Sequence, residues 1–106
     1  MKTKNILLDI PNKINEEIFQ ELAKTKNCKI QRIISRNHKT PKNKWYDQTE
    51  NEFIIILQGN AEILFKTEKS VIMKEGDYLN IPSHVKHRVE KTSDKEETMW
   101  LAIHYN

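Results

Sequence analysis

The rhythm of short apolar segments after Cys28 is the feature that most restricts the fold of this chain. The segments recur at a spacing of about 8–12 residues and are separated by turn signals such as Gln58-Gly59-Asn60 and Glu75-Gly76-Asp77. This spacing is typical of an all-β sandwich or barrel and not of alternating βαβ units. The predicted strands cover residues 28–35, 45–47, 52–58, 61–66, 70–73, 77–81, 86–91 and 98–105.

The residues before Cys28 have a different pattern. Residues 5–10 predict a short strand or an extended arm. Beyond them Ile14, Ile18 and Leu22 recur every four residues, which predicts a helix of about ten residues. Asn27 can adopt the left-handed conformation that ends such a helix.

Length, charge and cysteine content restrict the class of protein. With 106 residues the chain is predicted to be one domain, with an arm and helix in residues 1–27 and a β-barrel in residues 28–106. The net charge is only +3 and the lysines are scattered, so we expect no nucleic-acid partner. No apolar run approaches the roughly 20 residues of a membrane span, and no signal-peptide pattern is present, so we expect a cytoplasmic protein without a membrane partner. A single cysteine, Cys28, excludes an internal disulfide.

The run Phe53-Ile54-Ile55-Ile56-Leu57 is apolar on both faces of its predicted strand. Such a strand must be covered twice, once by the barrel core and once by another layer. The predicted helix or a second subunit could supply that layer. We expect a homodimer, because an uncovered face of this kind promotes association.

Two motifs give the chain a resemblance to a known family. The first motif reads Gly76, five residues, Pro82, Ser83, His84, two residues, His87. The other reads Glu52, six residues, Gly59, and 16 residues, 60–75, separate the two. They resemble the G-x5-P-x-G-x2-H motif and the E-x6-G tail of the cupin superfamily. The resemblance covers about residues 30–105 and implies a small single-domain cupin, a double-stranded β-helix (jelly-roll) barrel.

The chain departs from the family where cupins carry two further histidines. Its sequence there is Trp45-Tyr46-Asp47-Gln48. If four residues separate the second histidine position from Glu52, the two positions fall on Trp45 and Asp47. If three residues separate them, the two positions fall on Tyr46 and Gln48. The segment resembles a subgroup of small bacterial cupins that brings no assigned reaction with it.

The resemblance implies a metal site in which Glu52 and His87 occupy ligand positions. Asp47 or Gln48 could supply a third oxygen. One imidazole with carboxylate or amide oxygens suits a divalent ion such as manganese, iron(II), nickel or zinc. The predicted metal ligands are therefore Asp47, Gln48, Glu52 and His87.

The other candidate residues have competing structural roles. Tyr46 and His84 are predicted pocket residues, although His84 follows Pro82 in a turn where the family has glycine, and hydrogen bonding within that loop is its main alternative. We expect the lone histidines His38 and His104 to be structural.

Three functions stay open on the sequence. The first is a metal-binding cupin, or a metal-dependent enzyme, that acts on a small polar molecule. The second is a metal-free module that holds a small ligand between Tyr46, Glu52 and His87. The third is a dimer without a ligand. The sequence assigns no catalytic residue and no substrate, because one barrel fold hosts many chemistries.

Overall fold

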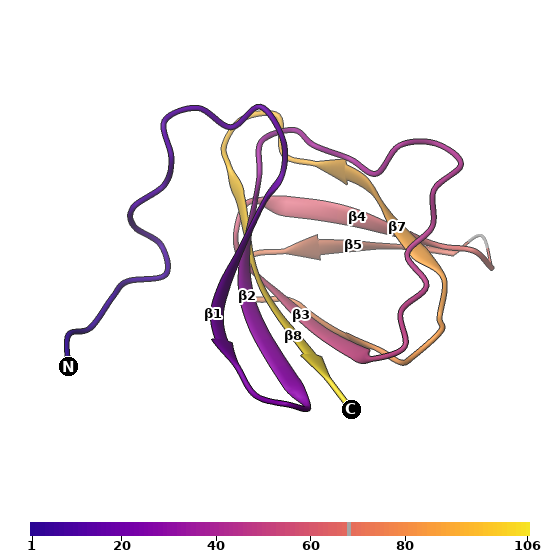
Figure 1. Ribbon diagram of the computed structural model, residues 1–106. Coiled ribbons are helices and arrows are strands. Elements are labelled where there is room, and N and C mark those ends of the chain that lie inside the picture. Colours follow the sequence, from indigo (N-terminus) through magenta and orange to yellow (C-terminus); the bar gives the residue numbers. More distant parts are fainter. Residues whose placement is uncertain (68) are drawn as a thin grey trace.

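The chain forms eight strands in two antiparallel sheets (Figure 1), seen here in a computed structural model that describes residues 1–67 and 69–106. This confirms the all-β prediction. The strands are β1 (Ile18–Lys24), β2 (Cys28–Ser35), β3 (Asn51–Gln58), β4 (Asn60–Phe65), β5 (Ser70–Lys74), β6 (Tyr78–Ile81), β7 (His87–Thr92) and β8 (Thr98–Tyr105).

The sheets pair strands that are far apart in the sequence. One sheet has five strands in the order β1-β2-β8-β3-β6, and the other has three in the order β5-β4-β7. The last strand, β8, lies between β2 and β3, so the end of the chain closes the larger sheet. Side chains alternate between the two faces of each strand. The inward ones form the core: Ile33, Ile54, Ile56, Ala61, Ile63, Met73, Ile81, Trp100 and Ala102.

The predicted N-terminal helix is wrong. Residues Ile18–Lys24 form β1, which pairs antiparallel with β2 and shifts register at a bulge between Glu21 and Ala23. A helix of about ten residues is marginal by itself, whereas β2 offers a full edge of backbone hydrogen-bonding groups. Asn27 lies in the turn that joins the two strands and not at a helix end. Among the described residues, no helix has the length and apolar character needed to cross a membrane.

Residues 5–10 form an arm that runs beside the larger sheet (Figure 1), with a turn at residues 6–8 in place of the predicted strand or fully extended chain. The guanidinium of Arg32 holds this arm by donating hydrogen bonds to the carbonyl oxygens of Ile6 (3.0 Å), Leu8 (2.6 Å) and Asp9 (3.3 Å). It also donates one to Oε1 of Gln20 (2.7 Å). Arg32 is thereby buried on the outer face of the sheet, with hydrogen-bond acceptors in place of water.

The part of that outer face formed by β3 and β8 carries apolar side chains that are only half-buried. Phe53 and Ile55 point outward from β3, and Leu101 and Ile103 lie opposite them on β8. The ring of Phe53 stacks on Tyr78 at a centroid distance of 5.2 Å. No helix of the described residues covers this face, so a second copy of the chain stays our prediction for it.

The dimer prediction has a direct test in solution. We expect light scattering to give twice the mass of the chain, and Ile55→Lys to give the monomer, because a lysine cannot be buried unpaired in an apolar interface. Lys29→Glu, a charge change at the margin of the sheet, serves as the control and should leave the mass unchanged. A wild-type monomer at high protein concentration would contradict the prediction.

Candidate functional site

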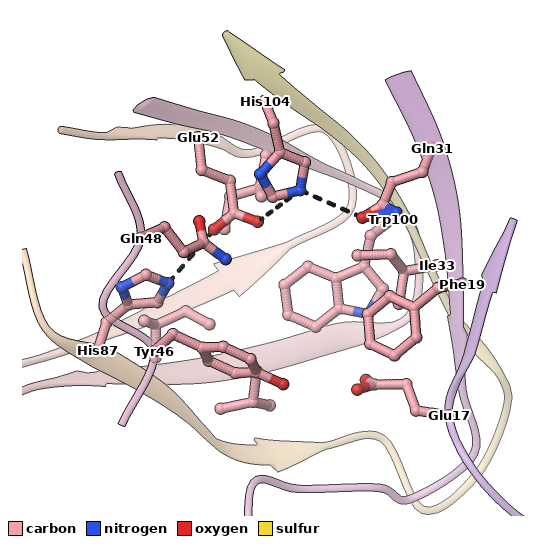
Figure 2. A pocket seen from close by; sticks show the side chains of 13 residues that line it. Glu17, Phe19, Gln31, Ile33, Tyr46, Gln48, Glu52, His87, Trp100 and His104 are labelled. Atoms are coloured by element: carbon pink, nitrogen blue, oxygen red, sulfur yellow. Dashed lines mark hydrogen bonds and ion pairs between the residues drawn. The ribbon is translucent and has the colours of Figure 1, made fainter. Parts of the chain in front are cut away.

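A pocket of about 70 Å³ opens into the barrel between the two sheets (Figure 2). One water needs roughly 10–15 Å³ on this measure, so the pocket accommodates a few waters or one small molecule. Its lining residues are Glu17, Phe19, Gln31, Ile33, Tyr46, Gln48, Glu52, Ile54, Ile63, His87, Val89, Trp100 and His104.

The backbone of Tyr46 sets which side chains of its segment enter the pocket. Tyr46 and His87 form a β-bridge, in which the Tyr46 amide donates to the His87 carbonyl (2.7 Å) and the His87 amide donates to the Tyr46 carbonyl (3.1 Å). Tyr46 and Gln48 both line the pocket, while Asp47 between them does not. The structure therefore favours the register in which Tyr46 and Gln48 take the two positions where cupins carry histidines, with three residues between Gln48 and Glu52.

Asp47 and His84 lie together outside the pocket. Nδ1 of His84 lies 2.8 Å from a carboxylate oxygen of Asp47, and the two side chains are 64% and 40% exposed. Neither Asp47, a predicted metal ligand, nor His84, a predicted pocket residue, lines this pocket. His84 has a φ of 62°, the left-handed conformation in which the family's glycine would be relaxed.

Glu52 lies at the centre of the polar part of the pocket. Its Oε1 is 3.3 Å from Nε2 of His87, and its Oε2 is 3.5 Å from Nε2 of His104. All three side chains are buried. Glu52 and His104 are directly paired between β3 and β8, and Nε2 of His104 also lies 3.2 Å from Oε1 of Gln31.

Sequence reasoning missed His104 as a pocket residue. Its inward position follows from alternation with Trp100 and Ala102, which face the same side of β8. Only the pairing of β8 with β3, strands about 50 residues apart, brings it to Glu52. Alternation alone could have indicated an inward histidine but not its partner.

His87 is held with one ring nitrogen aimed at Glu52. Nδ1 of His87 lies 2.8 Å from the Val85 carbonyl, which can only accept, so Nδ1 carries a proton. In the neutral ring, Nε2 would then face the Glu52 carboxylate with its lone pair. This contact therefore calls for a second proton on the ring or for a cation between the two groups.

The surroundings of His87 favour its charged form in the metal-free protein. Burial lowers its pKa, but the hydrogen bond to Glu52, the hydrogen bond to the Val85 carbonyl and the charge of Glu52 together raise the pKa above its ordinary value. The protonated ring satisfies Glu52 when no other cation is present.

Gln48 contributes an unsatisfied acceptor next to this pair. Its Oε1 is buried without a hydrogen-bond partner, the one such side-chain atom among the described residues. Figure 2 shows the Gln48 amide next to the contact between His87 and Glu52. Because a buried polar atom without a partner costs about 1–3 kcal/mol, a bound group that satisfies it is favoured.

The acidic and histidine side chains do not form a ready-made metal cluster. In the described part of the chain, no three or more His, Cys, Asp or Glu side chains are grouped as a metal site would require. Glu52 contacts its two histidines through different oxygens. A metal ion held by Glu52 and His87 would draw a third protein ligand from the neighbouring amide oxygen of Gln48.

The comparisons with known proteins identify the family of the chain. The family described as Cupin domain matches residues 36–104, so the chain belongs to the cupin family. A crystal structure from Ralstonia eutropha JMP134, titled "putative mannose-6-phosphate isomerase", is 37% identical, with a TM-score of 0.95 over 100% of this chain and 99% of that one. No match was found among curated proteins.

Two more distant structures share the fold. A cupin superfamily protein from Desulfitobacterium hafniense DCB-2 is 20% identical, with a TM-score of 0.74 over 91% of this chain and 83% of that one. A cupin with a double-stranded β-helix fold from Methanocaldococcus jannaschii is 14% identical, with a TM-score of 0.71 over 92% and 86% of the two chains.

The His87–Glu52 contact makes the stability of the metal-free protein depend on pH. Since the pKa of His87 is raised on folding, its charged pair stabilises fully below the ordinary histidine pKa, and the contribution is lost as the pH rises through the raised pKa. We expect an NMR titration of the His87 ring to have its midpoint above the ordinary value. Glu52→Gln should move that midpoint down and Asp47→Asn should not; an unchanged midpoint in Glu52→Gln would contradict the assignment.

Proposed function

We propose that this cupin binds a divalent metal ion at the Gln48–Glu52–His87 end of its pocket, together with a small molecule in the rest of it. The observation that carries the proposal is that three buried acceptors line the same end of the pocket (Figure 2). The orphaned Oε1 of Gln48, a carboxylate oxygen of Glu52 and the lone pair of neutral His87 are all acceptors without a donor between them. A cation satisfies all three.

The chemistry of this donor set fits such an ion. The bond from Nδ1 of His87 to the Val85 carbonyl fixes the tautomer in which Nε2 is free to coordinate, a common arrangement around metal-bound histidines. One imidazole with carboxylate and amide oxygens suits manganese, iron(II), nickel or zinc, and the share of oxygen favours the first two. When bound, the ion supplies a Lewis-acid centre for a metal-dependent reaction of a class we leave open.

The alternative is a metal-free binding module. It is favoured by the two histidines that already flank Glu52 and by the absence of a ready-made cluster among the described residues. In this alternative protonated His87 neutralises Glu52, and Gln48 accepts a hydrogen bond from the small molecule directly.

The isomerase name of the Ralstonia eutropha protein suggests a sugar phosphate as substrate. The charge of this pocket opposes that choice. Of the described residues, those that line the pocket include the carboxylates of Glu17 and Glu52 but no lysine or arginine. Because phosphate recognition relies on such cations, we do not extend that activity to this chain.

Metal titration of protein purified without a histidine tag and stripped with a chelator tests the proposal. We expect calorimetry to find one ion per chain for manganese, iron(II), nickel or zinc. His87→Ala and Glu52→Ala should each weaken binding by more than about 100-fold, since even residues that only support a ligand contribute 10–100-fold. Gln48→Ala should weaken it by roughly tenfold.

His84→Ala is the matched control, because it removes a histidine that lies outside the pocket. It should bind metal as the wild type does. Circular dichroism of His87→Ala separates a lost ligand from a lost fold. A folded wild-type protein that takes up none of the four ions would overturn the metal proposal and leave the metal-free module.

A further inference from the structure

The pocket has a second polar end, at its mouth, that the metal proposal does not use. Glu17, just before β1, lines this end with Phe19, Tyr46 and Trp100. Figure 2 shows the Glu17 carboxylate on the opposite side of the pocket from His87, with the aromatic rings between them.

The carboxylate of Glu17 is held in place by a chain of hydrogen bonds from the core. The indole Nε1 of Trp100 donates to Oγ of Ser35 (3.2 Å), and the Ser35 hydroxyl donates to Oε2 of Glu17. Ser35 is fully buried. Glu17 is thus oriented as a fixed group at the mouth.

No protein cation neutralises this carboxylate. Over residues 1–67 and 69–106, Glu17 takes part in no ion pair with a lysine, arginine or histidine. A partly buried carboxylate without a counter-ion is unfavourable, so a bound cation would stabilise the site. The pKa of Tyr46 is raised mainly by burial and next by the negative charge of Glu17 nearby.

The aromatic rings add an attraction for the same kind of ligand. A cation over the face of a tryptophan, tyrosine or phenylalanine gains about 0.5–2 kcal/mol, most when it is desolvated. Three such rings beside one carboxylate form the surroundings that suit an ammonium group. A small anion would meet two carboxylates and no lysine or arginine among the described lining residues.

We infer that the small molecule of this pocket is an organic cation, an amine or alkylammonium compound whose charged nitrogen lies between Glu17 and the rings of Phe19, Tyr46 and Trp100. The inference rests on the proposed function, because the same pocket would hold both the metal ion and the organic cation. The nitrogen occupies the mouth, and the polar remainder of the ligand extends towards Gln48 and Glu52. The pocket volume of about 70 Å³ limits the ligand to a small molecule.

Choline and its uncharged isostere, in which carbon replaces the quaternary nitrogen, test this inference. The two have the same shape and differ in charge. We expect calorimetry of the full chain to find choline bound at least about tenfold more tightly than the isostere, and tetramethylammonium more tightly than inorganic phosphate. NMR should show the indole signal of Trp100 shifting with choline.

Glu17→Gln removes the charge but keeps an oxygen for the Ser35 hydroxyl, so the fold should survive. It should abolish the preference for choline and leave metal binding unchanged; Asp47→Asn, a carboxylate outside the pocket, should leave both unchanged. Equal binding of choline and its isostere, tighter binding of phosphate, or no binding of either cation would overturn the inference. Since metal uptake is measured separately, failure here and failure of the metal site are distinguishable.

Discussion

Gly59→Ala is expected to lower the free energy of unfolding by about 2–5 kcal/mol. Gly59 joins β3 to β4 with a φ of 83°, a conformation that costs a residue with a Cβ about 1–2 kcal/mol. Its Cβ would also lie 2.6 Å from Oγ1 and 2.9 Å from Cα of Thr98, and 3.1 Å from the Glu97 carbonyl oxygen. Overpacking of this kind adds about 1–3 kcal/mol.

The neighbouring backbone has little freedom to relieve this clash. Thr98 begins β8 and is fully buried, and its Oγ1 donates to the Asn60 carbonyl (3.1 Å). Two of the three close atoms belong to the backbone of residues 97 and 98. The start of β8 would have to shift, and β8 connects β2 to β3.

Gly76→Ala is the matched control for this prediction. Gly76 has a similar φ of 89°, but no atom lies within 4 Å of the place of its Cβ. The free energy of unfolding of Gly76→Ala should therefore fall only by the conformational cost of the added Cβ, about 1–2 kcal/mol. Urea denaturation of both variants measures the difference; equal losses would show that close approach to Thr98 is not what Gly59 provides.

Arg32→Ala is expected to lower the free energy of unfolding by about 2–4 kcal/mol and to release the N-terminal arm. Hydrogen bonds from a charged donor contribute about 1.5–3 kcal/mol each, and Arg32 makes four. The net effect is smaller than their sum, because the carbonyl groups of the freed arm regain water.

Denaturation together with hydrogen exchange of the arm measures both parts of this prediction. We expect faster exchange of the Leu8 amide, which donates to the Asn5 carbonyl within the arm (3.1 Å). Arg36→Ala is the control, since Arg36 is 41% exposed and pairs with Glu97 at the surface, where such a pair contributes at most about 1 kcal/mol. If the arm stays protected from hydrogen exchange in Arg32→Ala, Arg32 is not the residue that holds the arm against the sheet.

The sequence predicted the barrel better than its N-terminal part. From Cys28 onward, alternation and turn residues located β2 to β8, because each strand repeats its inward and outward faces every two residues. The predicted strand at residues 45–47 is wrong, since only Tyr46 forms an isolated bridge there. Before Cys28 the spacing of Ile14, Ile18 and Leu22 indicated a helix. The edge of β2, which binds residues 18–24 as a strand, is a distant partner that local spacing does not reveal.

The candidate site was predicted in part. Glu52, His87, Gln48 and Tyr46 line the pocket as the motifs implied. The position of Asp47 depended on a register that only the bridge between Tyr46 and His87 decides. Glu17 could not be assigned at all from the sequence, because a hydrogen bond from Ser35 brings it to the pocket.

The location of a bound ion tests the central claim most directly. Crystals grown with manganese, measured at a wavelength where the ion scatters anomalously, should show one peak in the pocket at coordination distance from Glu52, His87 and the amide oxygen of Gln48. The same crystals of His87→Ala should lack it. A wild-type pocket with no peak, or a peak only at the exposed Asp47–His84 pair, would contradict the metal site.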